Sequence, residues 1–326
     1  MSGSWIAHVL AVLFVLTNSA SAAEKVKWVN DWLPGGDKAV VYVGVHAGLF
    51  AAEGLDVEIL SGRGSADAIT KVASGVGELT AAGIAALMQA KAQGTVPVRA
   101  ILSIYTKQPD AIFTSEGAGI KSLKDMEGKA IATGTFSSSN VIWPLVLQQN
   151  SVDPARVELV KVDPPALAPM LASGRVAGIV SWMPNVPLFD KALSATGKQL
   201  KILPWFDYGF QGYAFSLMAS DRMISERPEV LRKFMRAYRK ATEAAIANPR
   251  LAAESVRAQV PELDLAVAEA QWKASIPLMV NEVSKKDGMG AFEPALLKET
   301  WSWVSKSLNI SMDKLDSEQV VDRSFN

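Results

Sequence analysis

VASGVGELTAAG (72–83) is echoed by LASGRVAGIVSW (171–182), and this pair decides the architecture that the sequence predicts. Each stretch has the pattern of a helix end, a Ser-Gly turn with a valine close behind it, and a short strand. One such unit in each half of the chain delivers a loop at the carboxyl end of a strand, where open α/β sheets bind ligands. Because Ala-Ser-Gly is a common helix end, a chance match is the alternative interpretation.

Strands and helices alternate outward from both units. Apolar runs at 25–31, 55–60 and 78–83 predict strands, and the segments between them carry apolar residues at helical spacing. The same alternation restarts near residue 114, and from about 225 to 306 the chain is mainly helical. This order predicts an α/β protein with parallel sheets covered by helices on both faces, divided into two lobes.

The first residues have the features of a cleavable signal peptide, 1–23. The apolar run SWIAHVLAVLFVL leads into NSASAAE, whose small residues form an A-x-A-type cleavage site before Glu24. The segment lacks a Lys or Arg ahead of the apolar run, so an uncleaved anchor is the alternative, although the run is short for a span of about 20 residues. Cleavage predicts a soluble protein in the periplasm.

Composition excludes several classes of function. The chain has no cysteine, which excludes a disulfide framework, a thiolate zinc site, a cysteine nucleophile and a lipid-modified cysteine. His8 and His46 are the two histidines, too few for a histidine metal cluster, and no triad is expected. Lys plus Arg equal Asp plus Glu at 33 each, so no basic field indicates nucleic acid. We expect no catalytic residues, no metal and no cofactor.

The stretch DWLPGGDKAVVYVGVHAGLFAAEGLDVEI (31–59) resembles the NMT1/THI5-like substrate-binding proteins of ABC importers. That family includes carriers of the pyrimidine precursor of thiamine, and alkanesulfonate and taurine carriers are its relatives. The later stretches SGRGSADAITKVASGVGEL and LASGRVAGIVSWMPNVP are also similar to the family. The matching residues of the first stretch are Asp31, Trp32, Pro34, Tyr42, Gly48, Phe50 and the run Glu53-Gly54-Leu55-Asp56-Val57.

The resemblance implies a type II periplasmic binding protein fold, with two α/β lobes around a cleft joined by two crossover segments. Lobe one would comprise 24–113 plus 214–326, and lobe two 114–213. It also implies a monomeric carrier that docks on an ABC permease in the inner membrane. Two features depart from the family: Lys38 stands where the pyrimidine-precursor carriers have a histidine, and the clustered cysteines of the biosynthetic-enzyme branch are absent.

Three residues near the first strand are candidates for ligand contact. Trp32 and Tyr42 could form an aromatic wall for a flat ligand, because stacking supplies both contact area and orientation. Asp31 could accept a hydrogen bond from a ligand amine. The alternative for the aromatic residues is packing between helix and sheet, and the alternative for Asp31 is to cap its loop.

Small residues and one arginine provide further candidates in lobe one. Ala82 and Gly83 at a strand end would let a ligand approach the backbone and the free N–H groups of the next helix, or would allow tight packing. Arg63 in SGRGS matches the geometry of a carboxylate or sulfonate, and a solvated loop arginine is the alternative.

The stretch TGTFSSSNVIWP (133–144) places several polar residues where a helix begins. One serine can cap that helix, and three exceed what capping requires. Since Pro144 lacks an N–H and fits without a kink only in a first turn, the helix is expected to start near Val141. The residues before it would form an irregular turn facing the cleft: Ser137, Ser138, Ser139 and Asn140.

Two more segments of lobe two carry candidates. SWMPNVP (181–187) ends the echoed strand, with Trp182 as an opposite aromatic wall and Asn185 as a polar selector. Tyr208 and Gln211 lie near the return crossover and could close the cleft, or could belong to an ordinary edge strand.

These residues predict the periplasmic substrate-binding component of an ABC importer that captures a small, planar, polar ligand. The favoured ligand is a thiamine-precursor pyrimidine or related heterocycle, and the alternative is an organosulfonate, taurine or another small anion. Alternatives of a different class are a pyrimidine-processing enzyme and the input domain of a sensor.

Overall fold

The computed structural model describes residues 22–325. Residues 1–21 of the predicted signal peptide therefore lie outside the described part of the chain. Within 22–325, no helix is long and apolar enough to cross a membrane.

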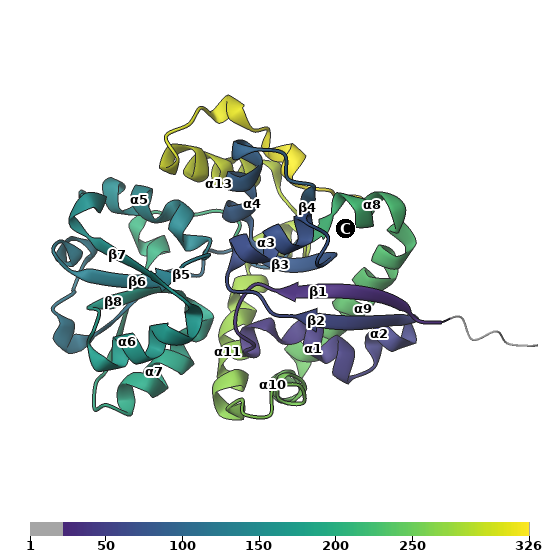
Figure 1. Ribbon diagram of the computed structural model, residues 1–326, viewed down its shortest axis with the longest axis horizontal. Coiled ribbons are helices and arrows are strands. Elements are labelled where there is room, and N and C mark those ends of the chain that lie inside the picture. Colours follow the sequence, from purple (N-terminus) through teal and green to yellow (C-terminus); the bar gives the residue numbers. More distant parts are fainter. Residues whose placement is uncertain (1–21, 326) are drawn as a thin grey trace, which may run out of the picture.

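Two five-stranded sheets form the framework, and they lie side by side in Figure 1. The first has the order β2-β1-β3-β10-β4 and the second the order β7-β6-β8-β5-β9. Their strands are β1 (Glu24–Asn30), β2 (Leu55–Leu60), β3 (Leu79–Gly83), β4 (Val98–Ser103), β5 (Asp110–Ser115), β6 (Ala130–Gly134), β7 (Glu158–Val162), β8 (Gly178–Trp182), β9 (Leu200–Pro204) and β10 (Phe215–Ser220).

The two echoed sequence units occupy matching places in the two sheets. Strands β3 and β8, which end the echoed stretches, are each third in their sheet. The predicted repeat is therefore structural, and the predicted two-lobed α/β fold class is confirmed.

One strand in each sheet is antiparallel, contrary to the expectation of purely parallel sheets. Strand β10 runs antiparallel to β3 and β4, and β5 runs antiparallel to β8 and β9. Each of these strands enters its sheet directly after the chain has crossed from the other lobe, through residues 104–109 or 205–214. The predicted boundary at residues 113 and 114 falls inside β5, which pairs only within the second sheet.

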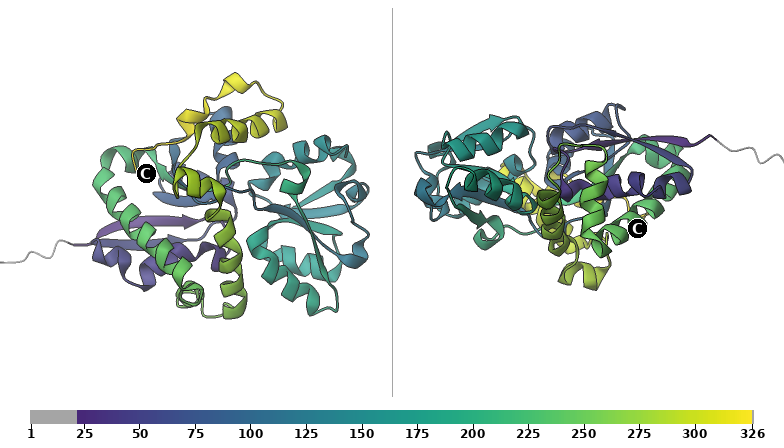
Figure 2. Two further views of the ribbon diagram at one scale, coloured as in Figure 1. Left: turned by 180° about the vertical axis from the view of Figure 1, so that it is seen from behind. Right: turned by 90° about the horizontal axis from the view of Figure 1, so that it is seen from below.

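Helices cover both faces of each sheet (Figures 1 and 2). The C-terminal helix α13 packs on α4 of lobe one and α5 of lobe two, and α11 contacts α7 of lobe two. The helices are α1 (Ala39–His46), α2 (Leu49–Ala52), α3 (Ser65–Ala73), α4 (Ile84–Gln93), α5 (Ser139–Gln149), α6 (Leu167–Ser173), α7 (Val186–Ser194), α8 (Asp221–Glu226), α9 (Pro228–Ala247), α10 (Pro249–Arg257), α11 (Leu265–Met279), α12 (Glu282–Asp287) and α13 (Pro294–Ser307).

Local sequence explains where several helices begin and end. Gly48 has a φ of +67°, so it separates α1 from α2 in the left-handed region that glycine favours. Prolines open α9, α10 and α13, since a first-turn residue needs no backbone N–H.

The predicted start of α5 near Val141 is wrong. The helix begins at Ser139 and continues through Pro144. Its first bonds are short-range, from the Asn140 N–H to the Ser137 carbonyl and from the Val141 N–H to the Ser138 carbonyl. The hydroxyl of Ser138, the residue before α5, makes no cap bond, whereas the Ser137 hydroxyl accepts from the Ser139 N–H at 3.3 Å.

Candidate functional site

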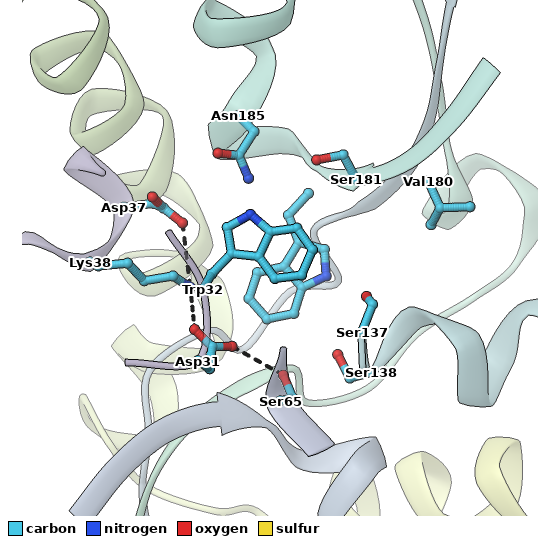
Figure 3. Close-up of a pocket in the computed structure, with 11 residues that line it drawn as sticks. Asp31, Trp32, Asp37, Lys38, Ser65, Ser137, Ser138, Val180, Ser181 and Asn185 are labelled. Atoms are coloured by element: carbon cyan, nitrogen blue, oxygen red, sulfur yellow. Dashed lines mark hydrogen bonds and ion pairs between the residues drawn. The ribbon is translucent and has the colours of Figure 1, made fainter. Parts of the chain in front are cut away.

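A pocket lies between the two lobes, where the loops after β1, β6 and β8 converge (Figure 3). It contains about 360 Å³ of space unoccupied by atoms, part of it open to solvent. Its lining comes from both lobes: Asp31, Trp32, Asp37, Lys38 and Ser65 from lobe one, and Ser137, Ser138, Val180, Ser181, Trp182 and Asn185 from lobe two.

The lobe-one wall contains a buried group of charges. The Lys38 ammonium lies 2.9 Å from the Asp31 carboxylate and 3.4 Å from the Asp37 carboxylate. Lys38 is 7% exposed and Asp31 is 3% exposed. The second Asp31 oxygen accepts a hydrogen bond from the Ser65 hydroxyl, whose oxygen in turn accepts one from the Gly83 N–H. We call Asp31, Asp37 and Lys38 the charged triad.

A short 3₁₀ turn, Gly36–Lys38, places Asp37 and Lys38 directly before α1. The Gly36 N–H donates to the Gln271 side chain on α11. A Cβ atom at Gly36 would lie 1.7 Å from the Ala268 carbonyl oxygen, so only glycine allows this turn to approach α11 so closely. The close packing of the GGDK loop against α11 thus buries Asp37 and Lys38.

Electrostatic attraction opposes the cost of burying Lys38 and Asp31. Burial opposes the charge on Lys38, but Asp31 and Asp37 outweigh it and hold the pKa of Lys38 above its ordinary value. Burial raises the pKa of Asp31, and the neighbouring Lys38 opposes that rise. The triad is therefore a compensated buried ion group rather than a free cation.

Aromatic rings enclose the remaining side of the Lys38 ammonium. It lies 3.9 Å from the centre of the Phe215 ring and 5.0 Å from that of the Trp182 ring, within the range of cation–π attraction. Since Trp182 belongs to lobe two, this contact links the two walls of the pocket. Two carboxylates and two ring faces thus surround the ammonium.

The lobe-two wall is built around Asp110, the first residue of β5. One Asp110 oxygen accepts hydrogen bonds from the Trp182 indole N–H at 3.1 Å and from the Ser139 hydroxyl at 2.5 Å. Asp110 is 5% exposed, and burial is the main cause that raises its pKa to about 6. A single buried carboxylate therefore fixes both the tryptophan wall and the start of α5.

Polar groups without a protein partner face this pocket. Within residues 22–325, no hydrogen bond involves the Ser138 hydroxyl, the Ser181 hydroxyl, the Asn185 side-chain NH₂ or the Trp32 indole N–H. The Asn185 oxygen accepts from Gln271 at 3.0 Å, which holds the amide in place. Figure 3 shows the Trp32 indole in the middle of these groups. They are free to contact a bound molecule.

The predicted residues Asp31, Trp32, Ser137, Ser138, Trp182 and Asn185 all line the pocket. Ser139 and Asn140, the other two predicted residues of the serine turn, lie behind the pocket surface. The Ser139 hydroxyl is directed to Asp110, and Asn140 closes the turn through its bonds with Thr133, Gly134 and Thr135. These bonds give the turn its shape, and neither residue is part of the pocket lining.

Other predicted residues of lobe one lie outside the lining. Tyr42 is buried in the lobe-one core, where its hydroxyl accepts from Asn30 at 2.6 Å and burial raises its pKa to about 12. Arg63 has a side chain 58% exposed, 3.8 Å from Asp67 and 5.0 Å from the Phe136 ring. Ala82 and Gly83 are buried in β3, with Gly83 against Ser138.

The two predicted crossover residues also lie away from the pocket. Tyr208 packs at the edge of an apolar cluster, and Gln211 is exposed. Four lining residues were not predicted: Asp37, Ser65, Val180 and Ser181. Lys38 was noted only as a departure from the family, and Asp110 was missed. The sequence signal that could have identified Asp37 and Lys38 is their adjacent opposite charges directly after Gly35 and Gly36. Glycines allow such a loop to pack closely against the protein, and paired charges can be buried.

The two lobes are in close contact around the pocket. A Cβ atom at Gly83 would lie 2.2 Å from the Ser138 hydroxyl oxygen, and one at Gly134 would lie 2.4 Å from the Trp32 ring. The Ala66 N–H also donates to the Phe136 carbonyl across the junction. These contacts describe a closed arrangement of the cleft. No group of three or more His, Cys, Asp or Glu within the described residues could hold a metal ion.

Comparison with known proteins gives a family and several relatives. Residues 36–252 match the family described as NMT1/THI5 like. The riboflavin-binding protein RibY of Chloroflexus aurantiacus is 25% identical over 291 residues, covering 87% of this chain and 81% of the relative. The formylaminopyrimidine-binding protein of Halalkalibacterium halodurans is 25% identical over 307 residues, covering 92% of each.

An enzyme and a solved structure are also similar. The 4-amino-5-hydroxymethyl-2-methylpyrimidine phosphate synthase of Candida albicans is 27% identical over 239 residues, covering 70% of this chain and 69% of the enzyme. The alkanesulfonate-binding protein SsuA of Xanthomonas axonopodis pv. citri, bound to MOPS, superposes with a TM-score of 0.73 at 15% identity. That superposition covers 93% of this chain and all of the other, and it shows a shared fold.

Proposed function

The chain belongs to the NMT1/THI5-like family, and from this premise we propose that it is the substrate-binding component of an ABC importer. Its ligand is a small, flat heterocycle with polar edges, of the thiamine-precursor pyrimidine class. The lobes close over this ligand, as two-lobed binding proteins do by hinge motion.

One observation carries the proposal: the Trp32 indole lies inside the interlobe pocket, with Trp182 in the opposite wall and the unbonded polar groups of Ser138, Ser181 and Asn185 around it. Aromatic faces bind flat rings, and fixed hydroxyl and amide groups read the ring edge. Two relatives that cover 87% and 92% of this chain are named for flat nitrogen heterocycles, riboflavin and formylaminopyrimidine.

We propose binding rather than turnover. Both of those wide-coverage relatives are named as binding proteins, whereas the synthases match over 70% of this chain. Recovery of the bound compound unchanged, by mass spectrometry after prolonged incubation with the protein, would support this. A product of different mass would revive the enzymatic alternative.

The cellular location and the partner protein are further parts of this proposal. A signal peptide cleaved before Glu24 delivers the chain to the periplasm, where a monomer presents both lobes to an inner-membrane permease. We keep the predicted division into 24–113 plus 214–326 and 114–213, with the first boundary moved to the start of β5 so that the strand is whole.

The sulfonate alternative lacks its principal residue. Arg63 was its proposed anion partner, and Arg63 is absent from the pocket lining. The likeness to a sulfonate carrier is one of fold.

A thermal-shift screen of the protein starting at Glu24 tests the proposal. The panel contains 4-amino-5-hydroxymethyl-2-methylpyrimidine, formylaminopyrimidine, riboflavin and taurine. A ligand at one hundred times its dissociation constant stabilises the native state by about 2.7 kcal/mol, which raises the midpoint measurably. We expect a shift with a heterocycle that is lost in Trp32→Ala and kept in Phe206→Ala, which changes an exposed aromatic residue outside the lining. A shift with taurine alone would contradict the proposal.

A further inference from the structure

The charged triad determines which charge a ligand can bring into the pocket. In a binding protein for anions, a lysine in this wall would be the natural partner of the ligand. Here the Lys38 ammonium has two carboxylates, at 2.9 Å and 3.4 Å, and two aromatic faces around it. Because the ammonium already pairs with both carboxylates, a ligand anion would have to compete with them for it.

The sum of charges has the same consequence. Two carboxylates and one ammonium leave the triad with one net negative charge, and Asp110 adds a further acidic group behind Trp182. No other Lys, Arg or His of the described chain lines the pocket. Because the three side chains of the triad are buried, their charges are weakly screened, so a phosphate or sulfonate would meet net repulsion.

The two carboxylates are not equivalent. Asp31 is committed twice, to Lys38 and to the Ser65 hydroxyl. Asp37 makes the longer contact with Lys38, and within residues 22–325 no hydrogen bond engages its other oxygen. Asp37 lines the pocket, but Figure 3 shows that oxygen turned away from Trp32, so Asp37 offers a ligand its charge and not a hydrogen bond.

We infer that the charged triad makes this pocket selective for neutral or cationic heterocycles and against their phosphorylated or sulfonated counterparts, with Asp37 as the residue that sets this preference. The inference rests on the proposed function for the identity of the ring, and concerns the charge that the ring may carry.

Matched ligand pairs test the inference. Titration calorimetry would compare 4-amino-5-hydroxymethyl-2-methylpyrimidine with its monophosphate, and riboflavin with riboflavin 5′-phosphate. We expect the phosphorylated member of whichever pair binds to bind at least tenfold more weakly. Equal or tighter binding of the phosphorylated member overturns the inference while leaving the proposed function intact.

Asp37→Asn removes one negative charge and leaves Lys38 paired with Asp31. We expect it to reduce the preference for the neutral member by at least fivefold. The matched control is Asp56→Asn, which removes a charge from an exposed position on the edge strand β2 and should leave the ratio unchanged. An unchanged ratio in a folded Asp37→Asn protein would overturn the role of Asp37.

A bromide soak of crystals of the wild-type protein tests the pocket without a heterocycle. If none of the four compounds binds, the proposed ligand class fails, and the soak still decides the inference. Bromide in the pocket, located by anomalous scattering, overturns it. Bromide elsewhere on the protein, with none beside Lys38, supports it.

Discussion

The two walls of the pocket are built on the same framework and carry opposite chemistry. Strands β1 and β6 hold the second place in their sheets, and the loop after each reaches the pocket. The loop after β1 supplies a buried ion group, whereas the loop after β6 supplies serine hydroxyls and backbone. A repeated fold thus fixes where a loop lies, and the loop residues alone decide what it offers.

The walls also differ in how they are held together. The lobe-one wall depends on attraction between full charges that are removed from water, and such a group is costly to break when one partner is lost. The lobe-two wall depends on one carboxylate that accepts two hydrogen bonds from neutral groups. Substitutions in the two walls should therefore differ in how much they change the free energy of unfolding and in how that change depends on pH.

Removing the single cation should have the largest effect. Lys38→Met leaves Asp31 and Asp37 buried together without compensation, and we expect the free energy of unfolding to fall by about 3–5 kcal/mol. Urea denaturation would measure it. The control is Lys285→Met, which breaks an exposed pair with Glu282 and should cost under about 1 kcal/mol. If both variants lose the same small amount, the lobe-one wall does not depend on its charges.

The lobe-two carboxylate should produce a pH dependence. The pKa of Asp110 is about 6 in the folded protein and about 4 when unfolded, so between these values the folded state binds more protons. The contribution of Asp110 to stability is therefore greatest below about pH 4, and it falls as pH rises to about 6. The total loss is about 3 kcal/mol.

Asp110→Asn keeps an oxygen that can accept from Trp182 and Ser139. We expect it to abolish this loss and to stabilise the protein at pH 7, by up to about 3 kcal/mol. Denaturation at a series of pH values in both proteins would measure the difference. A variant that is less stable than the wild type at pH 7 would show that the wall requires the carboxylate charge.

A substitution at the contact between the walls should have the smallest effect of the three. It should act on closure of the lobes and on ligand affinity. Gly83 has a φ of −68°, which any residue adopts, so Gly83→Ala adds no backbone strain. The new methyl group collides with Ser138 of the opposite lobe. We expect ligand affinity to fall about tenfold, or about 1.4 kcal/mol, and solution X-ray scattering to report a more open protein. Gly94→Ala, with open space around it, is the control, and equal scattering from both variants would contradict the closed contact.

The fold could be predicted because its signals are local. Alternating strands and helices, the echoed units and the restart near residue 114 each lie within a short window of sequence. The antiparallel placement of β5 and β10 could not be predicted in this way. It depends on pairing with strands far along the chain, and the apolar runs DAIFT and YAFSLMAS do not encode direction.

The site could be predicted in part for a related reason. Trp32, Trp182 and the serine turn follow strand ends, and strand ends converge at one edge of a sheet. The role of Lys38 could not be predicted, because a lysine is normally exposed unless paired, and its partners meet it only when the loop folds against α11. The position of Tyr42 was open between core and pocket, since a helix buried on several faces has no unique inward side.

The position of β10 has a consequence for how the protein is made. This strand lies between β3 and β4, yet it follows all of lobe two in the sequence. A chain that emerges from its N-terminus can complete the second sheet while the first still lacks a central strand. The N-terminal lobe is thus the later one to mature, and the edges of β3 and β4 that β10 joins stay unpaired until that strand arrives.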